Sequence, residues 1–551
     1  AKITYKRGTE IIKQLNQRFN PYDICFTLKD IRTLNSSFAL SGSNLGLVSN
    51  LLWQLGNHDS EALNVYIVDE ICTTTDNGLI CEIQGAAGGA VAIITDHTIN
   101  VYPEDVTFDH EIGHCFGLKH AFDGHNASSG CERVTRNPSD PLYNANYAGD
   151  GIEDTNAIRV LDDINVNIVT CQYNNAPMVN CYGEIINVTQ EDVDNIMNYS
   201  LKCANMFTEG QKEYMHNYLA NYYEMWNYDY NGLDLMLRNT ENDFGIEPDV
   251  NSEYLWVSPD IWVRNSDDDG LEHQNPISNT INYVYVRITN KSCETTLGIE
   301  TLKLHWSKAG TNLLLQIWEG QFNTSTQQLG GLVDEFEIPL MDGYETRILK
   351  FAWQAPELLT NDFGNEPWHY CLLAKINSPS EIESLPISDG FSYLFRNSNN
   401  IALKNITLLE NNLNNQTGSI LVGNFDNTTE KVILKFVKDN KELNSSIFNE
   451  AEIKVKLDSY LFDLWQNSNF SGTNIRRVNN EIIVFENSEI IINSFPAKKF
   501  GVLNVGINFL TQNSTSKTEF NFHVIQLDDK KNVIGGEKYN ISKKTRNLFR
   551  A

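Results

Sequence analysis

The sequence predicts a multidomain protein in which an α+β domain precedes two all-β sandwich domains. The chain has 551 residues, more than the roughly 100–200 that one domain commonly holds. Helical and strand patterns are mixed up to about residue 240, whereas only strand patterns follow. The composition, 41% hydrophobic and 21% charged, is typical of folded domains and excludes wholesale disorder.

The charge balance narrows the range of partners. Lys and Arg number 42 and Asp and Glu number 71, which gives a net charge of −29. An anionic chain repels phosphate backbones, so we expect no nucleic-acid partner. No apolar run approaches the roughly 20 residues of a membrane-spanning helix, so we expect no transmembrane segment. The chain begins Ala1-Lys2 without Met or a signal peptide, and we interpret it as a trimmed or mature form.

The first domain is predicted to span residues 1–240. Its first helix is expected at 8–19, where Ile11, Ile12, Leu15 and Phe19 follow a helical spacing. A second helix is expected at 207–226, where Thr208 and Gln211 form a T-x-x-Q capping box. Apolar runs typical of strands occupy 24–28, 63–71 and 88–95. The polar stretch 227–253, rich in Asn, Asp and Gly, indicates the exit from this domain.

Two β-sandwich domains are predicted to follow, at 255–396 and 401–551. Short runs with a period of two, such as NYVYVRITN and KVILKFVK, alternate there with turn residues. The boundary is set at the Asn- and Ser-rich stretch 397–400. The segment SPDIWVRNSDDDG…NYVYVRITN of the first of these domains resembles the Ig-like modules of secreted bacterial proteases. The second is expected to be a binding or docking module.

The most informative segment is H-E-x-x-H-x-x-G-x-x-H at residues 110–120. His110 and His114 are four residues apart, so both imidazoles can reach one ion from the same face of a helix. Gly117 is expected to end this helix in the left-handed conformation and to turn the chain so that His120 becomes a third ligand. Three protein ligands leave one zinc position open, the arrangement of a catalytic site. Glu111 would face a water molecule there.

An H-E-x-x-H segment alone could be an ordinary helix whose histidines are satisfied by the protein. The glycine and the third histidine at fixed spacing make zinc binding the stronger hypothesis.

The motif resembles that of the metzincin metallopeptidases. Their second mark is a tight turn whose Met side chain underlies the three histidines, and Asn195-Ile196-Met197-Asn198-Tyr199-Ser200 is similar to it. The resemblance implies that Met197 forms the floor of the metal site. It also implies that Tyr199 helps to hold the reacting carbonyl; the alternatives are that Met197 is ordinary core and Tyr199 a surface aromatic.

Within this clan, residues 1 to about 230 resemble the pappalysin family. Four segments carry the resemblance in the same order: HEIGHCFGLKHAF (110–122), GDGIEDT (149–155), NIMNYS (195–200) and MFTEGQ (206–211). The family holds calcium in this part of its C-terminal subdomain, and Asp150, Glu153 and Asp154 offer oxygen ligands of the right type. The alternative interpretation is a solvated acidic loop.

The ten cysteines, eight of them within the first 203 residues, indicate disulfides and an oxidising compartment. The resemblance implies the pairs Cys131–Cys181 and Cys171–Cys203. Cys72 and Cys81 are close enough in sequence for a local bridge, and Cys293 could meet Cys371 across a sandwich. Cys25 and Cys115 remain; they could bridge each other, or Cys115 could be an unpaired core residue.

Two features depart from the family pattern. The interval between Cys131 and Cys171 is long, which predicts a surface insertion. Lys202 follows the Met-turn where relatives that cut before basic residues carry acidic side chains, so we expect Lys202 to disfavour Arg or Lys just after the scissile bond.

Together these features predict a secreted or cell-surface, bacterial zinc endopeptidase that hydrolyses protein or peptide substrates with Glu111 as general base. The substrate is expected to pair with the strand 88–95, and the β domains to offer surface or glycan contacts. The competing hypothesis is an adhesin or assembly component that carries a silent or latent protease domain.

Overall fold

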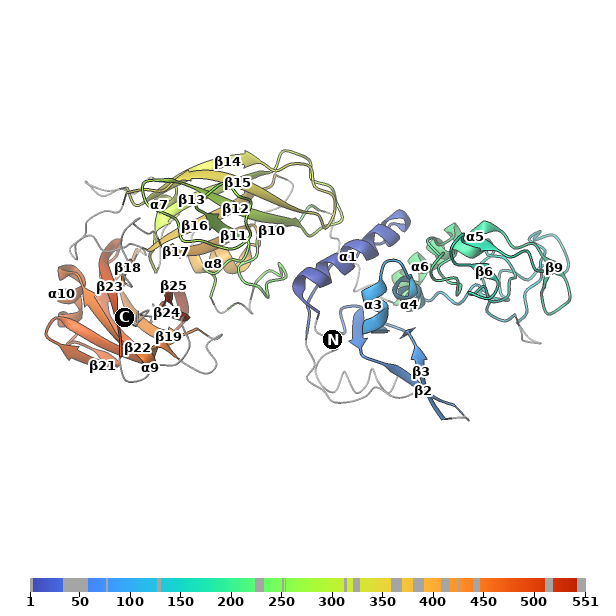
Figure 1. Ribbon diagram of the computed structural model, residues 1–551, viewed down its shortest axis with the longest axis horizontal. Coiled ribbons are helices and arrows are strands. Elements are labelled where there is room, and N and C mark those ends of the chain that lie inside the picture. The colour runs from blue at the N-terminus through green and yellow to red at the C-terminus, as the bar shows by residue number, and fades with distance from the viewer. Residues whose placement is uncertain are drawn as a thin grey trace, which may run out of the picture. The chain divides into compact units, whose positions relative to one another are not determined.

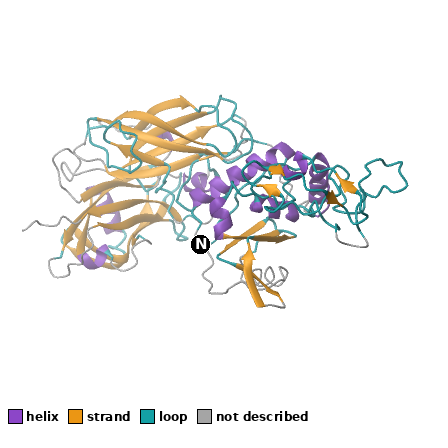
Figure 2. Cartoon of the chain, turned by 45° about the vertical axis from the view of Figure 1, so that its right-hand side comes forward, coloured by secondary structure: helices purple, strands orange, loops and turns teal. Residues whose placement is uncertain are grey.

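A computed structural model describes the chain in two compact units, Ala1–Asn231 and Gly232–Ala551. The described residues are 3–32, 58–75, 78–125, 130–222, 232–249, 252, 254–311, 315–320, 328–357, 369–379, 391–407, 417–424, 427–439, 446–510 and 519–542. Helices and short strands are mixed in the first unit, whereas long strands dominate the second (Figures 1 and 2).

The first unit contains six helical segments and nine short strands among its described residues. They are α1 (Tyr5–Phe19), η1 (Asn20–Tyr22), β1 (Asn64–Val68), β2 (Ile71–Thr75), β3 (Gly78–Ile83), β4 (Gly85–Gly88), β5 (Val91–Thr95), α3 (Asp96–Val101), α4 (Thr107–Cys115), β6 (Val166–Asn167), β7 (Gln172–Tyr173), β8 (Met178–Val179), β9 (Ile185–Ile186), α5 (Gln190–Asp194) and α6 (Glu209–Tyr222).

Helix α1 begins after Thr4, whose hydroxyl accepts a hydrogen bond from the Arg7 N–H, and it buries Leu15 and Phe19. The strand expected at 24–28 does not form. The side chain of Asn16 accepts from the N–H of Phe26 and donates to its carbonyl, at 2.7 and 2.9 Å. Because a side chain satisfies this backbone, the segment packs on α1 without a strand partner.

A three-stranded sheet with the order β1-β5-β4 lies beside α4. Strand β5 is parallel to β1 and antiparallel to β4, and all five of its residues are buried. The expectation that a substrate pairs with 88–95 is therefore wrong for β5, since both of its edges are occupied. Among the described residues, β1 and β4 are the two edge strands of this sheet.

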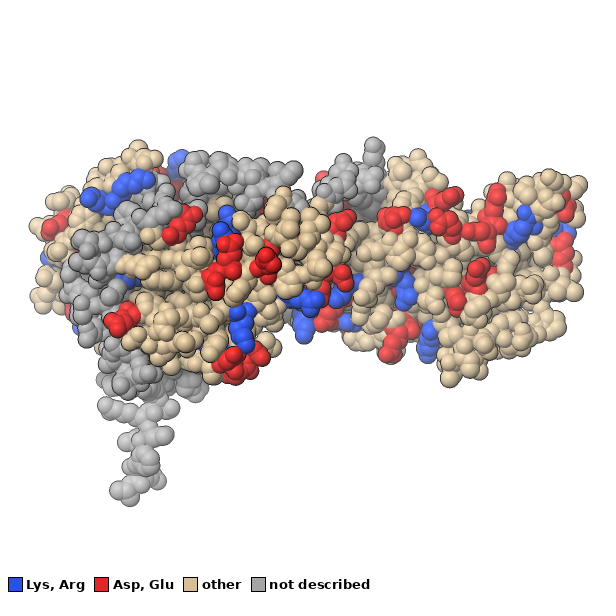
Figure 3. Space-filling view, turned by 90° about the horizontal axis from the view of Figure 1, so that it is seen from above, with Lys and Arg blue, Asp and Glu red and all other residues tan. Residues whose placement is uncertain are grey.

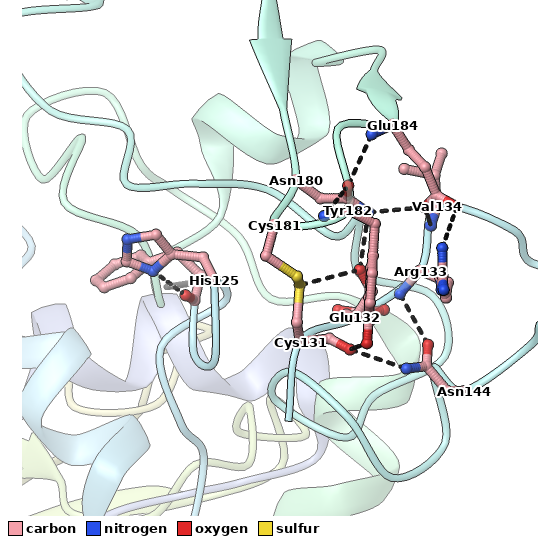
Figure 4. The surroundings of a disulfide bond; sticks show 11 residues. His125, Cys131, Glu132, Arg133, Val134, Asn144, Asn180, Cys181, Tyr182 and Glu184 are labelled. Carbon is pink, nitrogen blue, oxygen red and sulfur yellow. Dashed lines mark hydrogen bonds and ion pairs between the residues drawn. A yellow bond between two sulfur atoms is a disulfide. The ribbon is translucent and has the colours of Figure 1, made fainter. Parts of the chain in front are cut away.

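The second half of this unit is tied together by the disulfides Cys131–Cys181 and Cys171–Cys203. Around the first one, the carboxylate of Glu184 accepts hydrogen bonds from the guanidinium of Arg133 and the N–H of Val134 (Figure 4). The long interval after Cys131 forms turns and the hairpins β6–β7 and β8–β9. Covalent and polar links hold this region where regular secondary structure is sparse.

Two other cysteine pairings are wrong. Cys371 is a buried free thiol whose Sγ donates to Asn405 and to Glu537, so it is not bonded to Cys293. Cys115 is also free and buried in the core beneath α4, so it does not pair with Cys25. Cys25, Cys81 and Cys293 are disulfide-bonded, and the side chain of Cys72 lies outside the described ones.

The second unit contains β10 (Leu235–Met236), β11 (Ile261–Arg264), β12 (Ile281–Asn290), β13 (Thr301–Lys308), α7 (Leu315–Trp318), β14 (Gly330–Glu337), β15 (Thr346–Gln354), β16 (His369–Asn377), α8 (Phe391–Asn397), β17 (Ile401–Thr407), β18 (Thr417–Asn424), β19 (Glu430–Lys438), α9 (Ile447–Glu450), β20 (Ala451–Leu457), α10 (Ser459–Asn467), β21 (Gly472–Val478), β22 (Glu481–Phe495), β23 (Lys499–Phe509), β24 (Glu519–Leu527) and β25 (Val533–Ser542).

Its first part consists of two four-stranded antiparallel sheets that share one core. One holds β10, β11, β12 and β15, and the other has the order β14-β13-β16-β17. Strand β17 lies beyond the boundary drawn at 397–400, yet all seven of its residues lie in its ladder with β16. The hydrogen-bonded sheet, rather than the Asn-rich stretch, determines where this strand belongs.

The last part is a single eight-stranded sheet rather than two separate sheets. The cause is the 15-residue strand β22. Its first residues pair with β20 and its last residues with β19, so one strand changes partner and connects both halves. Asn487, with φ of 62°, lies where the partner changes. The second sandwich domain stays a prediction.

One hydrophobic core runs through the whole second unit, from Leu233 to Ile541. Strand β18 contributes to its continuity, because Leu421 exchanges backbone hydrogen bonds with Ala309 and Thr311. No described helix has the length and apolarity needed to cross a membrane. On the face drawn in Figure 3, acidic and basic side chains are interspersed.

Candidate metal centre

Helix α4 carries the first two histidines, and the turn after it presents the third. Gly117 adopts φ of +84°, and the N–H of Leu118 bonds the carbonyl of Gly113. This left-handed turn reverses the chain and returns His120 to the helix. A Cβ at Gly117 would lie 2.4 Å from the ring of Tyr218, so glycine is required both by conformation and by packing.

The three imidazoles converge on one point. The Nε2 of His114 lies 3.1 Å from the Nε2 of His110 and 3.2 Å from that of His120. The possible ligand atoms of all three lie within 4.8 Å of one another, and they form the one such group found among the described residues. The Nδ1 atoms of His110 and His114 donate to the carbonyls of Ile196 and Leu118, both at 2.7 Å. These bonds turn both Nε2 lone pairs toward the shared point.

The protonation of these rings suits a metal. Burial, followed by the neighbouring His114, lowers the pKa of His110 to about 3 and that of His120 to about 4. Burial also lowers the pKa of His114. Three neutral imidazoles that face one another with no acid between them are a donor set that zinc prefers. The residues present therefore fit a zinc ion.

The Met-turn packs against helix α4. Met197 is fully buried, and a Cβ on Gly113 would lie only 2.6 Å from its Sδ. The turn is held by Asn195, whose side-chain oxygen accepts from the N–H of Met197 at 2.8 Å. The amides of Asn195 and Gln211 bond each other reciprocally, both at 3.1 Å. The capping box of α6, with Thr208 bonded to Gln211, is thus connected to the metal site.

Two further polar side chains border the histidines. Glu111 is 7% exposed, and burial raises its pKa to about 8. Tyr199 is 42% exposed, and its hydroxyl lies 3.2 Å from the Nε2 of His120. The structure therefore gathers His110, Glu111, His114, His120 and Tyr199 near Met197.

Two residues of this site were not identified from the sequence. Phe122 stacks on His120 with ring centroids 4.7 Å apart and an angle of 9° between the planes. Gly85, on β4, lies against the side chain of Glu111. Neither position belongs to the zinc motif, although Phe122 is two residues beyond it.

The acidic loop after Gly149 does not gather its three carboxylates. Asp150 is buried and accepts from the N–H of Ile152 and the hydroxyl of Thr155. Asp154 caps α6, accepting from the hydroxyl of Thr208 and the N–H of Gly210, both at 2.7 Å. Glu153 is exposed. These bonds give Asp150 and Asp154 structural roles within the loop and at the start of α6.

The site consists of three neutral histidines, one buried and two partly exposed, on an H-E-x-x-H helix and the turn after it, with a glutamate beside them. This arrangement is that of a zinc metallopeptidase. Comparison with known proteins points to the same class. Residues 58–220 match the peptidase M43 family model, Pregnancy-associated plasma protein-A. Over these residues the chain is similar to that family, the pappalysins, and this match together with the three histidines supports a zinc metalloendopeptidase.

One relative is an extracellular metalloprotease of Colletotrichum graminicola, 27% identical over 235 residues that cover 40% of this chain and 70% of the relative. Among solved structures, a CARDB domain from Pyrococcus furiosus covers 27% of this chain and 94% of its own, with 12% identity and a TM-score of 0.14. The collagen adhesin of S. aureus covers 51% of this chain and 90% of its own, with 9% identity and a TM-score of 0.13.

Proposed function

We propose that this protein is a secreted endopeptidase in which zinc is held by His110, His114 and His120 and Glu111 is the general base. The observation that carries the proposal is the convergence of three neutral imidazoles beside Glu111. Among the described residues, no basic side chain forms an ion pair with the Glu111 carboxylate. When bound, zinc supplies Lewis acidity that polarises the scissile carbonyl and lowers the pKa of water.

Glu111 performs the proton transfers. Its carboxylate accepts a proton from the attacking water and later delivers it to the amine that leaves. Met197 keeps the histidines in place and takes no part in proton transfer.

Tyr199 is proposed to stabilise the oxyanion. Its hydroxyl lies beside His120 and is partly exposed, so it can donate a hydrogen bond to a carbonyl oxygen as negative charge develops there. Tyr199→Phe should therefore lower kcat more than it raises KM.

The substrate is proposed to lie extended along the Gly85–Ala87 part of strand β4. This strand is an edge of its sheet, and its Gly85 end lies against Glu111. A peptide added at a sheet edge forms backbone hydrogen bonds whatever its side chains, which suits a protease that acts on varied sequences.

A location outside the cell is proposed on two grounds. The disulfides Cys131–Cys181 and Cys171–Cys203 persist in oxidising compartments, and the fungal relative is named an extracellular metalloprotease. A bacterial source, Ig-like β modules and calcium at Asp150, Glu153 and Asp154 stay predictions.

The test is digestion of a proteome-derived peptide library, read by mass spectrometry. The wild type is run with and without a zinc chelator, beside Glu111→Ala. Cuts that the chelator and the substitution both abolish are the expected result. A Glu111→Ala variant that still cuts would overturn the general-base assignment. A wild type that binds zinc but cuts nothing would favour an adhesin or assembly component with a silent domain.

A further inference from the structure

Gly85 is the first residue of strand β4, and its missing side chain leaves space for Glu111. A Cβ built on Gly85 would lie 2.7 Å from the Cγ of Glu111, 2.9 Å from its Oε1 and 3.1 Å from its Cδ. Real Cβ atoms essentially never approach other atoms below 3.0 Å. The φ of Gly85 is not in the left-handed region. This glycine is therefore explained by the contact with Glu111 and not by backbone conformation.

The same strand contains a glycine that lacks such a contact. A Cβ on Gly88 would have no heavy atom within 4 Å. Gly88 is three residues further along, where the chain turns into β5. The two glycines share a strand and a residue type, and they differ in what a methyl group would meet.

Glu111 depends on packing for its position. The rings of His110 and His114 are oriented by hydrogen bonds to backbone carbonyls. Among the described residues, no hydrogen bond or ion pair holds the Glu111 carboxylate in a comparable way. With no such bond to orient it, the surfaces that border the side chain determine where the carboxylate lies.

Strand β4 is fixed with respect to helix α4. Helix α4 packs directly against β4 and β5, and the buried Cys115 at its last residue belongs to the core between them. The four residues of β4 are also paired with β5. The strand cannot readily withdraw from an added methyl group, so the side chain of Glu111 would have to move instead.

We infer that Gly85 is a positioning residue for the general base: its lack of a side chain admits Glu111 between β4 and α4 and sets the carboxylate against the strand. The inference rests on the proposed function, because it assigns Gly85 a role only through Glu111. It predicts that a methyl group at Gly85 impairs proton transfer while leaving zinc and substrate binding largely intact.

The experiment compares Gly85→Ala with its matched control Gly88→Ala in the full chain loaded with zinc. Measured are kcat and KM on a peptide from the library digest, zinc affinity by chelator competition, and the thermal unfolding midpoint. Gly85→Ala should lower kcat about 10- to 100-fold, because an ångström of misplacement costs up to about 10²-fold. Its KM, zinc affinity and unfolding midpoint should match those of Gly88→Ala, and Gly88→Ala should keep kcat.

A second pair, Gly85→Val and Gly88→Val, tests the steric cause. The loss of kcat should grow from Ala to Val at Gly85 and stay absent at Gly88. Wild-type kcat in Gly85→Ala would overturn the inference. So would a loss that appears in KM alone, because Gly85 would then act on the substrate. An active Glu111→Ala variant would instead overturn the proposed function, so the two failures are distinguishable.

Discussion

In the N-terminal unit, three histidines face one another with no carboxylate paired to any of their rings among the described residues. In the second unit, two buried histidines each lie beside a buried carboxylate, His369 at 3.4 Å from Glu537 and His523 at 3.2 Å from Asp439. A histidine–carboxylate pair satisfies its own charge and hydrogen bonds. The histidines of the first unit differ, because the Nδ1 atoms of His110 and His114 donate to backbone carbonyls and leave their Nε2 lone pairs directed at one shared point.

The difference teaches where to look for chemistry in a structure without ligands. Burial alone perturbs titratable groups in both units, so a shifted pKa does not separate them. What separates them is whether the polar atoms find partners within the protein. The first unit directs three histidine rings at one point, which an external cation can occupy, whereas His369 and His523 of the second unit each face a carboxylate of the protein.

The largest expected effect comes from breaking the convergence itself. His114→Ala removes the ring that lies within 3.2 Å of both other histidines. Zinc affinity should fall by more than about 100-fold, since even outer partners of a ligand contribute about 10–100-fold, and peptide cleavage should cease. Chelator competition and a cleavage assay measure both quantities. The exposed His97 is the control, and zinc retention in His114→Ala would contradict the assigned ligand set.

A smaller effect is expected from the aromatic ring behind the third ligand. His120 has no described carbonyl on Nδ1, and Phe122 stacks on its ring instead. Phe122→Leu should weaken zinc binding by about tenfold, the lower end of what outer partners of ligands contribute. Phe26→Leu removes an aromatic ring that stacks on Phe116, away from the histidines, and should leave zinc affinity unchanged. Equal zinc affinities in both variants would show that stacking does not orient His120.

The paired groups of the second unit should respond to pH and not to zinc. Burial raises the pKa of Glu537 in the folded protein. The free energy of unfolding is therefore highest below the ordinary Glu pKa, where Glu537 is neutral, and it falls as the pH rises through the pKa of the folded protein. Glu537→Gln should reduce this loss as the pH rises above 4.5, by about 1.4 kcal/mol for each unit of pKa difference.

Urea unfolding followed by tryptophan fluorescence across this pH range measures the change. Glu519→Gln, at an exposed position, should leave the pH dependence as it is. If Glu537→Gln were destabilising to the same extent at every pH, Glu537 would be ionised and paired with His369, and the assumed neutral form would be wrong.

The smallest effect concerns specificity. Lys202 is exposed three residues after Tyr199, and we predict that it repels basic side chains just after the scissile bond. Lys202→Glu should raise kcat/KM for Arg at that position by up to about fivefold, because exposed charge pairs contribute at most about 1 kcal/mol. The gain should shrink as salt is added. A wild type that already prefers Arg or Lys there would contradict the prediction.

The metal centre could be predicted because most of its ligand information is local. The spacing of His110, His114 and His120 on one helix and its C-terminal turn is a property of the helix itself. Met197 was found through a second contiguous motif. Gly85 could not be found in this way, since its relation to Glu111 exists only through space, across a strand and a helix.

Topology was harder to predict than the elements. A strand at 88–95 is predicted, but its sequence does not say whether its edges are covered, and β1 and β4 occupy both of them. The run at 401–407 also formed a strand, yet its partner β16 precedes the boundary that composition suggested. Cys371 looked available for a disulfide, and only the surrounding Asn405 and Glu537 show that its thiol is satisfied otherwise.

The placement of β17 limits where the region Gly232–Ala551 can be divided, whether by protein engineering or by gene rearrangement. A truncation after residue 400 would strip the seven residues of β17 from the edge of β16 and expose an unpaired ladder. Such a fragment should aggregate rather than persist as an independent module. The region from Gly232 to Ala551 would then behave as one structural unit. It could be transferred to another enzyme, or deleted, only as a whole.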